Sequence, residues 1–485
     1  MAKSDDGYLS NINWAEARNE ASNESGAEIT ADEWIISILK ESLVASSHKR
    51  LSKVPPQLRE KEENKGFFDP RVVSIGPYHH GKPELKEVEK FKTKAVRAFI
   101  DGSKVEPHVI YNKMVEVVSD VRNCYLEGST DAYDDTAFAR MMLLDGCFLL
   151  HFIYINVSPR GPFLDELVKH VGEAGMRGII ADIILLENQL PFRVLQVLIS
   201  SSSSAESVLE EFIENFVVQV YIDNNATWRK QTYKQEVEQP IHFLDLVRRR
   251  FIITDSRTKE VVVSSSSGEK KVPHQTGSFK TINIPCWRPK SGNKKRNPLK
   301  DVYSHSFRSA TELKARGIHF RPSNTFSLND STFTSQFGYG LLTLPQLKFD
   351  WGIKYALLNM MAYELAPNSS NRLEVCNYIY FMNSLINGTE DVIELRTHNI
   401  IHNFYGTDEE VAKTFNSMAT GGGYLSLEGP IKDVSDQIQE HYNSRMKTWT
   451  AQLLHNYFSN PWSAVAFFAA TFALVLTFIQ TFFPR

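Results

Sequence analysis

Cysteine is scarce in this sequence and is never closely paired. The 485 residues include four cysteines, Cys124, Cys147, Cys286 and Cys376, and no two of them form a CxxC pair. Disulfide frameworks are typical of small secreted chains, and structural zinc sites need closely spaced ligand pairs. We therefore expect reduced thiols, with no metal site and no cofactor.

Common catalytic motifs and an excess of one charge are also lacking. The sequence has no GxSxG, P-loop, GxGxxG or HExxH motif, so the standard phosphate and hydrolase sites have no support. Lys and Arg total 54 against 57 Asp and Glu, which leaves a formal net charge of -3. This balance gives no whole-protein attraction to nucleic acid, which is not an expected partner. The first residues, MAKSDDGYLSNINWAEARNE, lack the apolar region of a secretory signal peptide.

Apolar residues, in contrast, are plentiful. They make up 42% of the chain, including 30 Phe, which is enough for a sizeable core and excludes global disorder. Most apolar residues recur at helical spacing, and two short segments read as strands of one small sheet. Helices are predicted at 84–101, 107–126, 138–155, 179–200, 206–222, 242–252, 352–366, 371–387 and 431–458, and strands at 317–321 and 339–350.

Local signals refine several of these elements. The segment 138–155 is apolar nearly all round, which is typical of a central core helix. Pro191 should bend or break the helix 179–200 after Leu190. Capping pairs precede further helices: Thr30 with Glu33, Ser309 with Glu312, and Thr407 with Glu410.

The C-terminal segment predicts a membrane span. Residues 461–483 read PWSAVAFFAATFALVLTFIQTFF, with no charged residue, and a bilayer core needs about 20 apolar residues. Backbone in lipid must satisfy its own hydrogen bonds, so the segment should be helical. Trp462 and Arg485 would lie at the two membrane interfaces. Since two residues follow the segment, we expect a single-pass tail anchor in the plasma membrane or an endomembrane, with the body in the cytosol. The alternative is a buried core helix.

Three parts of the chain are predicted. Residues 1–29 form a flexible polar N-terminus, 30–458 form a single, mostly helical domain, and 461–483 form the transmembrane helix. Within the domain, the Ser-rich stretch 254–300 gathers nine Lys or Arg between Lys270 and Lys300 and reads as a mobile basic insertion. It would either touch anionic lipid or nucleic acid, or simply be solvated. The fold class expected is mainly α: a large helical body with a small minor β-sheet and one C-terminal transmembrane helix.

A set of motifs in fixed order extends from about Trp34 to the end of the chain. Together they resemble the plant domain-of-unknown-function family 247. The resemblance implies a land-plant protein, largely helical and C-terminally anchored, from a family with no established catalytic activity. Some grass members are associated with self-incompatibility as pollen-side recognition determinants. The motifs are VSIGPYHHG (73–81), MMLLDGCFLLHF (141–152), DIILLENQLPF (182–192), HFLDLVR (242–248), SATELKARGIHF (309–320), YIYFMNSLI (378–386), EDVIELRTHNIIHNFYGTDEEVAKTFN (390–416) and YFSNPW (457–462).

Three acidic residues inside apolar segments are the best candidates for chemistry. Asp145, Asp182 and Glu187 lie where an ionised carboxylate is costly unless it is paired, and together they would hold a divalent metal for hydrolysis. The structural alternative is a hydrogen-bonded network that positions the helices, with Arg140, Asn188 or Gln189 as partners. We favour the structural reading, and we read His79, His80 and Cys147 as structural too.

These observations lead to two hypotheses about function. The first is a membrane-anchored plant recognition or signalling protein that binds other proteins, such as a secreted or membrane ligand, with the pollen-side self-incompatibility role as its specific form. Trp34 and Ile38, on an amphipathic leading helix, are its candidate binding residues, although this helix would equally dock on its own body. The second is a metal-dependent hydrolase or nuclease that uses the three carboxylates.

Overall fold

A computed structural model shows a mainly helical body with two small β-sheets, which confirms the predicted fold class of the body. The chain divides into two units, residues 1–49 and 50–485, and the first lies wholly outside the described residues. The predictions for residues 1–29, for Trp34 and Ile38, for the Thr30–Glu33 capping pair and for the insertion 254–300 also lie outside them. The structure describes residues 51–103, 105–202, 204–220, 239–252, 308–323, 327–336, 339–367, 372–404, 406–419, 427–443 and 461–482.

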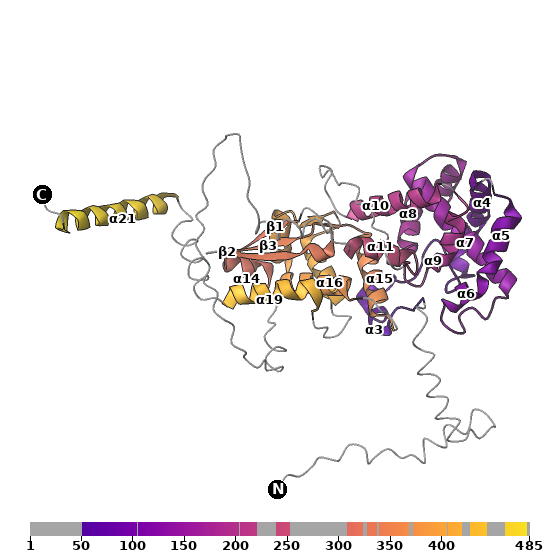
Figure 1. The fold of residues 1–485 in the computed structure, drawn as a ribbon, viewed down its shortest axis with the longest axis horizontal. Helices are drawn as coiled ribbons and strands as arrows, with labels where there is room; N and C mark the ends of the chain where they lie inside the picture. The colour runs from indigo at the N-terminus through magenta and orange to yellow at the C-terminus, as the bar shows by residue number, and fades with distance from the viewer. Residues whose placement is uncertain are drawn as a thin grey trace, which may run out of the picture. The chain divides into compact units, whose positions relative to one another are not determined.

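The first helices gather around α7 (Asp135–Val157), which contacts α4, α5, α6, α9 and α10 (Figure 1). Its first turn is capped by Asp134, whose side chain accepts a hydrogen bond from the Ala137 N–H at 2.7 Å. Buried residues occur on all sides of α7, so the predicted core helix is confirmed. The other helices of this half are α3 (Pro56–Arg59), α4 (Lys86–Ser103), α5 (Pro107–Glu116), α6 (Val118–Asn123), α8 (Pro162–Asp182), α9 (Phe192–Ile199), α10 (Ala205–Val220) and α11 (Phe243–Ile252), with the 3-10 turns η1 (Glu62–Asn64) and η2 (Pro83–Leu85).

The predicted helix 179–200 is interrupted, as expected, but the break begins earlier than Leu190. Helix α8 ends at Asp182, and residues 183–191 form buried turns before α9 begins at Phe192. The Asn188 and Gln189 side chains donate to backbone carbonyls of residues 182, 183 and 185, and so replace helical hydrogen bonds. Pro191 does separate the two segments, but as the residue before α9 and not as the start of the break.

The strands form two sheets where the sequence predicted one. In the first, β1 (Ile318–Pro322) is parallel to β3 (Tyr339–Leu344), and β2 (Thr332–Gln336) is antiparallel to β3. In the second, β4 (Leu347–Phe349) pairs in parallel with β5 (Ile401–Asn403). The predicted strand 339–350 is split at Pro345, which has no N–H to continue a ladder.

The remaining helices pack near these sheets. Ser309 caps α14 (Ala310–Ala315) as predicted, accepting from the Glu312 N–H at 3.4 Å. The capping box of α18 is also confirmed, since the Thr407 N–H donates to Glu410 at 2.8 Å and the Glu410 N–H donates to the Thr407 hydroxyl at 3.2 Å. The predicted helix 431–458 is confirmed as far as Asn443, where α19 ends, and its remainder lies outside the described residues. The bounds are η4 (Leu328–Asp330), α15 (Ile353–Leu365), α16 (Glu374–Leu385), α17 (Thr389–Thr397), α18 (Asp408–Ala419) and α19 (Gly429–Asn443).

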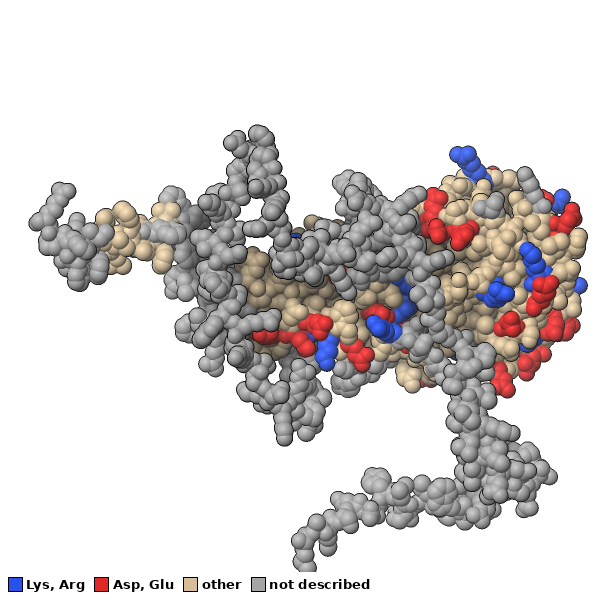
Figure 2. All heavy atoms as spheres, viewed as in Figure 1, with Lys and Arg blue, Asp and Glu red and all other residues tan. Residues whose placement is uncertain are grey.

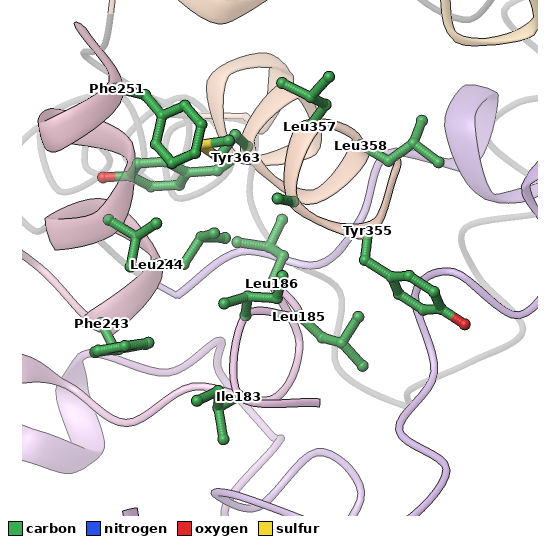
Figure 3. Close-up of a cluster of buried hydrophobic side chains, with 14 of the residues drawn as sticks. Ile183, Leu185, Leu186, Phe243, Leu244, Phe251, Tyr355, Leu357, Leu358 and Tyr363 are labelled. Carbon is green, nitrogen blue, oxygen red and sulfur yellow. The ribbon is translucent and has the colours of Figure 1, made fainter. Parts of the chain in front are cut away.

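One buried apolar cluster runs through the body from Leu51 to Ile438. The turn segment 183–191 lies near its middle, with Leu185 and Leu186 between α11 and α15 (Figure 3). Burial of each side chain of this size stabilises the fold by about 1.5–3 kcal/mol. The packing of Leu185 and Leu186 against α11 and α15 therefore stabilises the association of segments that are far apart in the sequence. The core side chains labelled in Figure 3 are Ile183, Leu185, Leu186, Phe243, Leu244, Phe251, Tyr355, Leu357, Leu358 and Tyr363.

Two long apolar helices, α7 and α21, bear on the predicted membrane span. Among the described residues, one helix passes a length and hydropathy test for a membrane span; this is α7, and 72% of its apolar window is buried inside the protein. The C-terminal segment forms α21 (Pro461–Phe482), a helix of 22 residues without a charged side chain. A membrane span at α21 stays a prediction.

Acidic and basic side chains are interspersed over the described surface in Figure 2. On the face shown, no broad field of Lys and Arg covers the described part of the body. The described atoms of α21 are neither blue (Lys, Arg) nor red (Asp, Glu). The described residues on this face therefore show no continuous positive patch of the kind expected at a nucleic-acid interface.

Candidate functional site

The segment 71–76 is held in place by side chains from the end of α8 and from the turn segment 183–191. The Asp182 carboxylate accepts hydrogen bonds from three consecutive N–H groups, those of Arg71 at 3.0 Å, Val72 at 2.7 Å and Val73 at 2.9 Å. The Asn188 amide accepts from the Ile75 N–H at 2.7 Å and donates to the Val73 carbonyl at 3.1 Å. Two predicted motifs, VSIGPYHHG and DIILLENQLPF, are thus joined by buried hydrogen bonds.

Burial and hydrogen bonding act on Asp182 in opposite directions. The side chain is 2% exposed, and desolvation raises its pKa to about 6. The backbone N–H groups of residues 71–73 favour the charged form and lower the pKa. Because all three donors point at the carboxylate, Asp182 serves as an acceptor for backbone N–H groups.

Asp145 is committed to a buried ion pair. Its Oδ1 lies 2.6 Å from Nζ of Lys92, and its Oδ2 accepts from the Gly76 N–H at 2.8 Å. Lys92 is itself fully buried and also contacts Glu89 at 2.7 Å and the Ser74 carbonyl at 2.7 Å. Desolvation raises the pKa of Asp145, and the Lys92 charge opposes that rise. The pair therefore ties α4 and α7 to the segment 71–76.

Glu187 has a third set of partners. Its Oε1 accepts from the Val54 N–H at 2.7 Å and lies 3.0 Å from Nη2 of Arg59. Nε2 of His79 lies 3.9 Å from Oε2 of Glu187, which is too far for a hydrogen bond. Burial is the largest cause that lowers the pKa of His79, to about 4, so the imidazole is neutral at pH 7. His80 is half-buried and packs edge-on against the Tyr133 ring.

The three candidate carboxylates therefore do not share a site. Asp145, Asp182 and Glu187 bind Lys92, the backbone of residues 71–73, and Arg59 with Val54, respectively. Among the residues that the structure describes, no group of three or more His, Cys, Asp or Glu is placed to hold a metal ion. This geometry gives no support to the hypothesis of one metal shared by the three carboxylates. The structural network is present, with Asn188 and Gln189 as members, while Arg140 is exposed on α7.

Further contacts of Gln189, together with Asn359, which the sequence did not single out, complete this network. Gln189 accepts from the Leu244 N–H at 2.9 Å, which brings in the HFLDLVR motif. Asn359 accepts from the Leu186 N–H at 2.9 Å and donates to the carbonyls of Phe67 and Tyr355. Both contacts fix the turn segment against helices α11 and α15.

A second buried ion pair joins α11 to α15 and α16. Arg248 lies 2.7 Å from Glu364 and 2.5 Å from Glu374, and Glu364 also accepts from the N–H groups of Val375 and Cys376. The sequence signal was available, since Arg248 lies four residues after Leu244 and three before Phe251, on one buried helix face. Lys92 likewise follows Val88 by four residues on the buried face of α4.

Of the other predicted site residues, the structure describes the surroundings of Cys147 and leaves the binding and membrane-interface residues untested. Cys147 is fully buried, and desolvation raises its thiol pKa well above the usual range, which fits a packing residue and not a nucleophile. Trp462 lies in the first turn of α21, and Arg485 lies outside the described residues. Trp34 and Ile38 also lie outside them, so binding at these residues and the interface roles of Trp462 and Arg485 stay predictions.

Comparison with known proteins gives long matches to plant sequences. A family model described as plant protein of unknown function, DUF247, matches residues 51–476. The chain is 30% identical over 429 residues to UPF0481 protein At3g47200 of Arabidopsis thaliana, covering 86% of this chain and 83% of that protein. It is 24% identical over 479 residues to the putative UPF0481 protein At3g02645 of the same plant, covering 86% of each. No solved structure matches the chain.

Proposed function

This chain belongs to the DUF247 family of plant proteins, and from that premise we propose that it is a membrane-anchored recognition protein that acts by binding other proteins. The observation that carries the proposal is α21, a helix of 22 residues with no charged side chain. Several of its large apolar side chains are exposed to solvent, including Phe472 at 65% and Leu474 at 72%. Removal of apolar surface from water is favourable by about 25 cal/mol per Å². The hydrocarbon core of a bilayer would bury these exposed side chains.

The state of the cysteines supports a body on the cytosolic side of a plasma or internal membrane. Cys124, Cys147 and Cys376 are all present as free thiols in the described part of the chain. Disulfides are typical of secreted domains and are rare in the reducing cytosol. Protease protection of sealed vesicles tests this orientation, since a cytosolic body should be digested without detergent.

The described motifs support a recognition role rather than catalysis. Their acidic and amide side chains bind backbone and buried cations within the body, as shown for Asp145, Asp182 and Asn188. These residues are used to hold the core together, so partner choice should depend on surface segments outside it. We assign that role to residues 1–54, with Trp34 and Ile38 as anchors, to the insertion 254–300 and to the segment 421–433.

Exchange of surface segments between relatives tests this assignment. Residues 1–54 of the full chain would be replaced by those of a close relative, and bound proteins would be recovered by crosslinking in membranes. Partner choice that follows the exchanged segment supports recognition through Trp34 and Ile38. A chimera that folds and keeps the original partner contradicts it.

The family resemblance supports a more specific form of this proposal, in which the chain is a pollen-side self-incompatibility determinant. Disruption of the gene in the source plant should then let pollen succeed on stigmas that normally reject it. Unchanged rejection would contradict this specific form and leave the membrane anchor unaffected.

A further inference from the structure

A cavity of about 310 Å³ lies where the segment 67–71, the start of α15 and one side of α18 meet. We call it the Trp351 pocket. Its size is at the lower end of the range for small-molecule sites, about 300–1,000 Å³. The residues that line it are Phe67, Arg71, Phe349, Asp350, Trp351, Lys354, Tyr355 and Thr414.

Aromatic rings form much of the wall. The centroids of the Phe67 and Tyr355 rings are 4.7 Å apart, and those of Trp351 and Tyr355 are 6.4 Å apart. In Figure 3 the Tyr355 side chain points away from the core cluster of Leu185 and Leu186, with its hydroxyl at the far end. These rings offer flat apolar surface to a ligand.

Two cations are held against these rings. Nζ of Lys354 lies 4.3 Å from the centroid of the Phe67 ring, and the Arg71 guanidinium lies 5.8 Å from that of Tyr355. The Arg71 guanidinium also donates to the Gly66 carbonyl at 3.1 Å. A Cβ at Gly66 would lie 2.8 Å from Nη2 of Arg71, and the backbone there has a φ of 78°, so glycine is needed for this close approach.

The acidic residue at the pocket is already engaged. Oδ1 of Asp350 accepts from the N–H groups of Gly352 at 2.9 Å and Ile353 at 3.1 Å, which caps α15. Its Oδ2 lies 3.8 Å from Nζ of Lys348, outside the set of lining residues. Asp350 is therefore shared between a helix cap and another lysine. Two acids outside the set of lining residues also act on the cations of the pocket, Asp182 on Arg71 and Glu63 on Lys354.

Lys354 occupies an unfavourable position for a cation. It lies in the first turn of α15, where the helix dipole is positive. Desolvation is the largest cause that lowers the pKa of its ammonium, and Lys413 lowers it further, while Glu63 opposes both. Its Nζ donates to the Glu63 carbonyl at 2.8 Å, which is a neutral acceptor. An anion in the pocket would reverse this unfavourable balance.

We propose that the Trp351 pocket binds a small organic carboxylate with a flat apolar body. The carboxylate would lie between Arg71 and Lys354, where a guanidinium can donate two parallel N–H groups and the ammonium adds a point charge. The apolar body would stack on Trp351 and Tyr355. A small anion without such a body would leave the aromatic rings exposed to water. This inference goes beyond the proposed recognition of proteins and does not depend on it.

Titration calorimetry on the full chain in lipid nanodiscs tests the proposal, with empty nanodiscs as the blank. The probes are 2-naphthoate, benzoate and indole-3-carboxylate. Two matched compounds separate the contributions: 2-naphthylmethanol keeps the flat body without the charge, and acetate keeps the charge without the body. Inorganic phosphate is the sixth compound tested. We expect saturable binding of at least one aromatic carboxylate with a Kd below about 1 mM, and at least ten-fold weaker binding of the alcohol, acetate and phosphate.

Substitutions locate the binding to this pocket. Lys354→Met and Arg71→Gln should each weaken binding of the aromatic carboxylate by about ten-fold or more, the usual loss for a charge-assisted contact. The Asp182 contacts use the backbone N–H of Arg71, so Arg71→Gln keeps them if Lys354→Met fails to fold. Lys169→Met, at an exposed position of α8, is the matched control and should bind as the wild type does.

Several results would overturn the proposal. These are no binding by any of the three aromatic carboxylates, equal binding of 2-naphthoate and its alcohol, or tighter binding of phosphate than of any of them. Unchanged binding in folded Arg71→Gln, or equal weakening in Lys169→Met, would place the ligand elsewhere.

Discussion

Replacement of Asp182 by Ala is the most informative change to the body. It removes the acceptor for the N–H groups of Arg71, Val72 and Val73, of which the Val73 donor is fully buried. Each buried donor left without a partner costs about 1–3 kcal/mol. Removal of a desolvated carboxylate offsets part of that loss, by about 3 kcal/mol at pH 7, because the folded pKa of about 6 lies above the ordinary value of 3.8. We expect a net loss of about 2–4 kcal/mol for Asp182→Ala, and a smaller loss for Asp182→Asn, which keeps one carbonyl oxygen.

The pH dependence of this effect has a definite sign. Because the folded pKa of Asp182 is raised, the folded state binds the proton more tightly than the unfolded state between pH 3.8 and about 6. The contribution to stability is therefore fully present below pH 3.8 and is lost as the pH rises through about 6. The stability advantage of the wild type over Asp182→Asn should be about 1 kcal/mol larger at pH 5 than at pH 7.

Urea unfolding of the full chain in detergent, followed by tryptophan fluorescence at pH 5 and pH 7, measures both effects. Glu166→Gln, at an exposed position of α8, is the control and should stay within about 0.5 kcal/mol of the wild type. A folded Asp182→Ala variant with wild-type stability would refute the structural role of this carboxylate. A gap to Asp182→Asn that grows from pH 5 to pH 7 would refute the assigned direction of its pKa.

Three further predictions concern buried residues of the body, including His242, which is fully buried directly before α11 and accepts a hydrogen bond from the Asp245 N–H at 3.1 Å. Asp145→Asn should destabilise the fold by up to about 3–5 kcal/mol, because it removes one of the two carboxylates that neutralise the buried Lys92 ammonium and leaves Glu89 alone. In a double-mutant cycle, the double variant Asp145→Leu with Lys92→Met should lose less stability than the two single changes combined. Gly76→Ala should cost at least about 2 kcal/mol in urea unfolding, since Gly76 has a φ of 76° and an added Cβ would lie 2.8 Å from the Gln189 carbonyl; unchanged stability would contradict this packing. His242→Asn should reduce the loss of stability on acidification from pH 7 to pH 5. Burial lowers the pKa of His242 to about 4, so the stability contributed by the neutral imidazole is lost as the pH falls from 6.5 towards 4. An equally steep loss of stability in the variant would exclude His242 as a cause.

The sequence predicted most helices because their apolar periodicity is local information. The core helix α7 and the capping box at Thr407 and Glu410 are confirmed in the structure. The turn segment 183–191 was mistaken for helix because its apolar residues pack on all sides, while Asn188 and Gln189 take over the backbone hydrogen bonds. These side-chain bonds join residues four to six apart, and the apolar spacing of the segment does not reveal them.

In the candidate site, too, the sequence predicted some features and not others. Burial of Asp145, Asp182 and Glu187 was correctly predicted from their apolar surroundings. Their separate partners were not predictable, since Lys92 and the backbone of residues 71–73 come from distant parts of the chain. Local periodicity indicates that a charge is buried, whereas the fold decides which group neutralises it.

The claim that this protein is held in a membrane by α21 is tested most directly by carbonate extraction. The full chain, a variant without residues 461–482 and Leu474→Arg would be expressed in plant cells, and the membrane pellet would be extracted with alkaline carbonate. An arginine at a helix centre costs about 2.5–3.5 kcal/mol for insertion, so we expect the wild type to stay in the pellet, the truncated chain to be released, and Leu474→Arg to be partly released. Leu474→Ile is the matched control and should behave as the wild type. Carbonate-resistant association of the truncated chain, or release of the wild type, would contradict the membrane anchor.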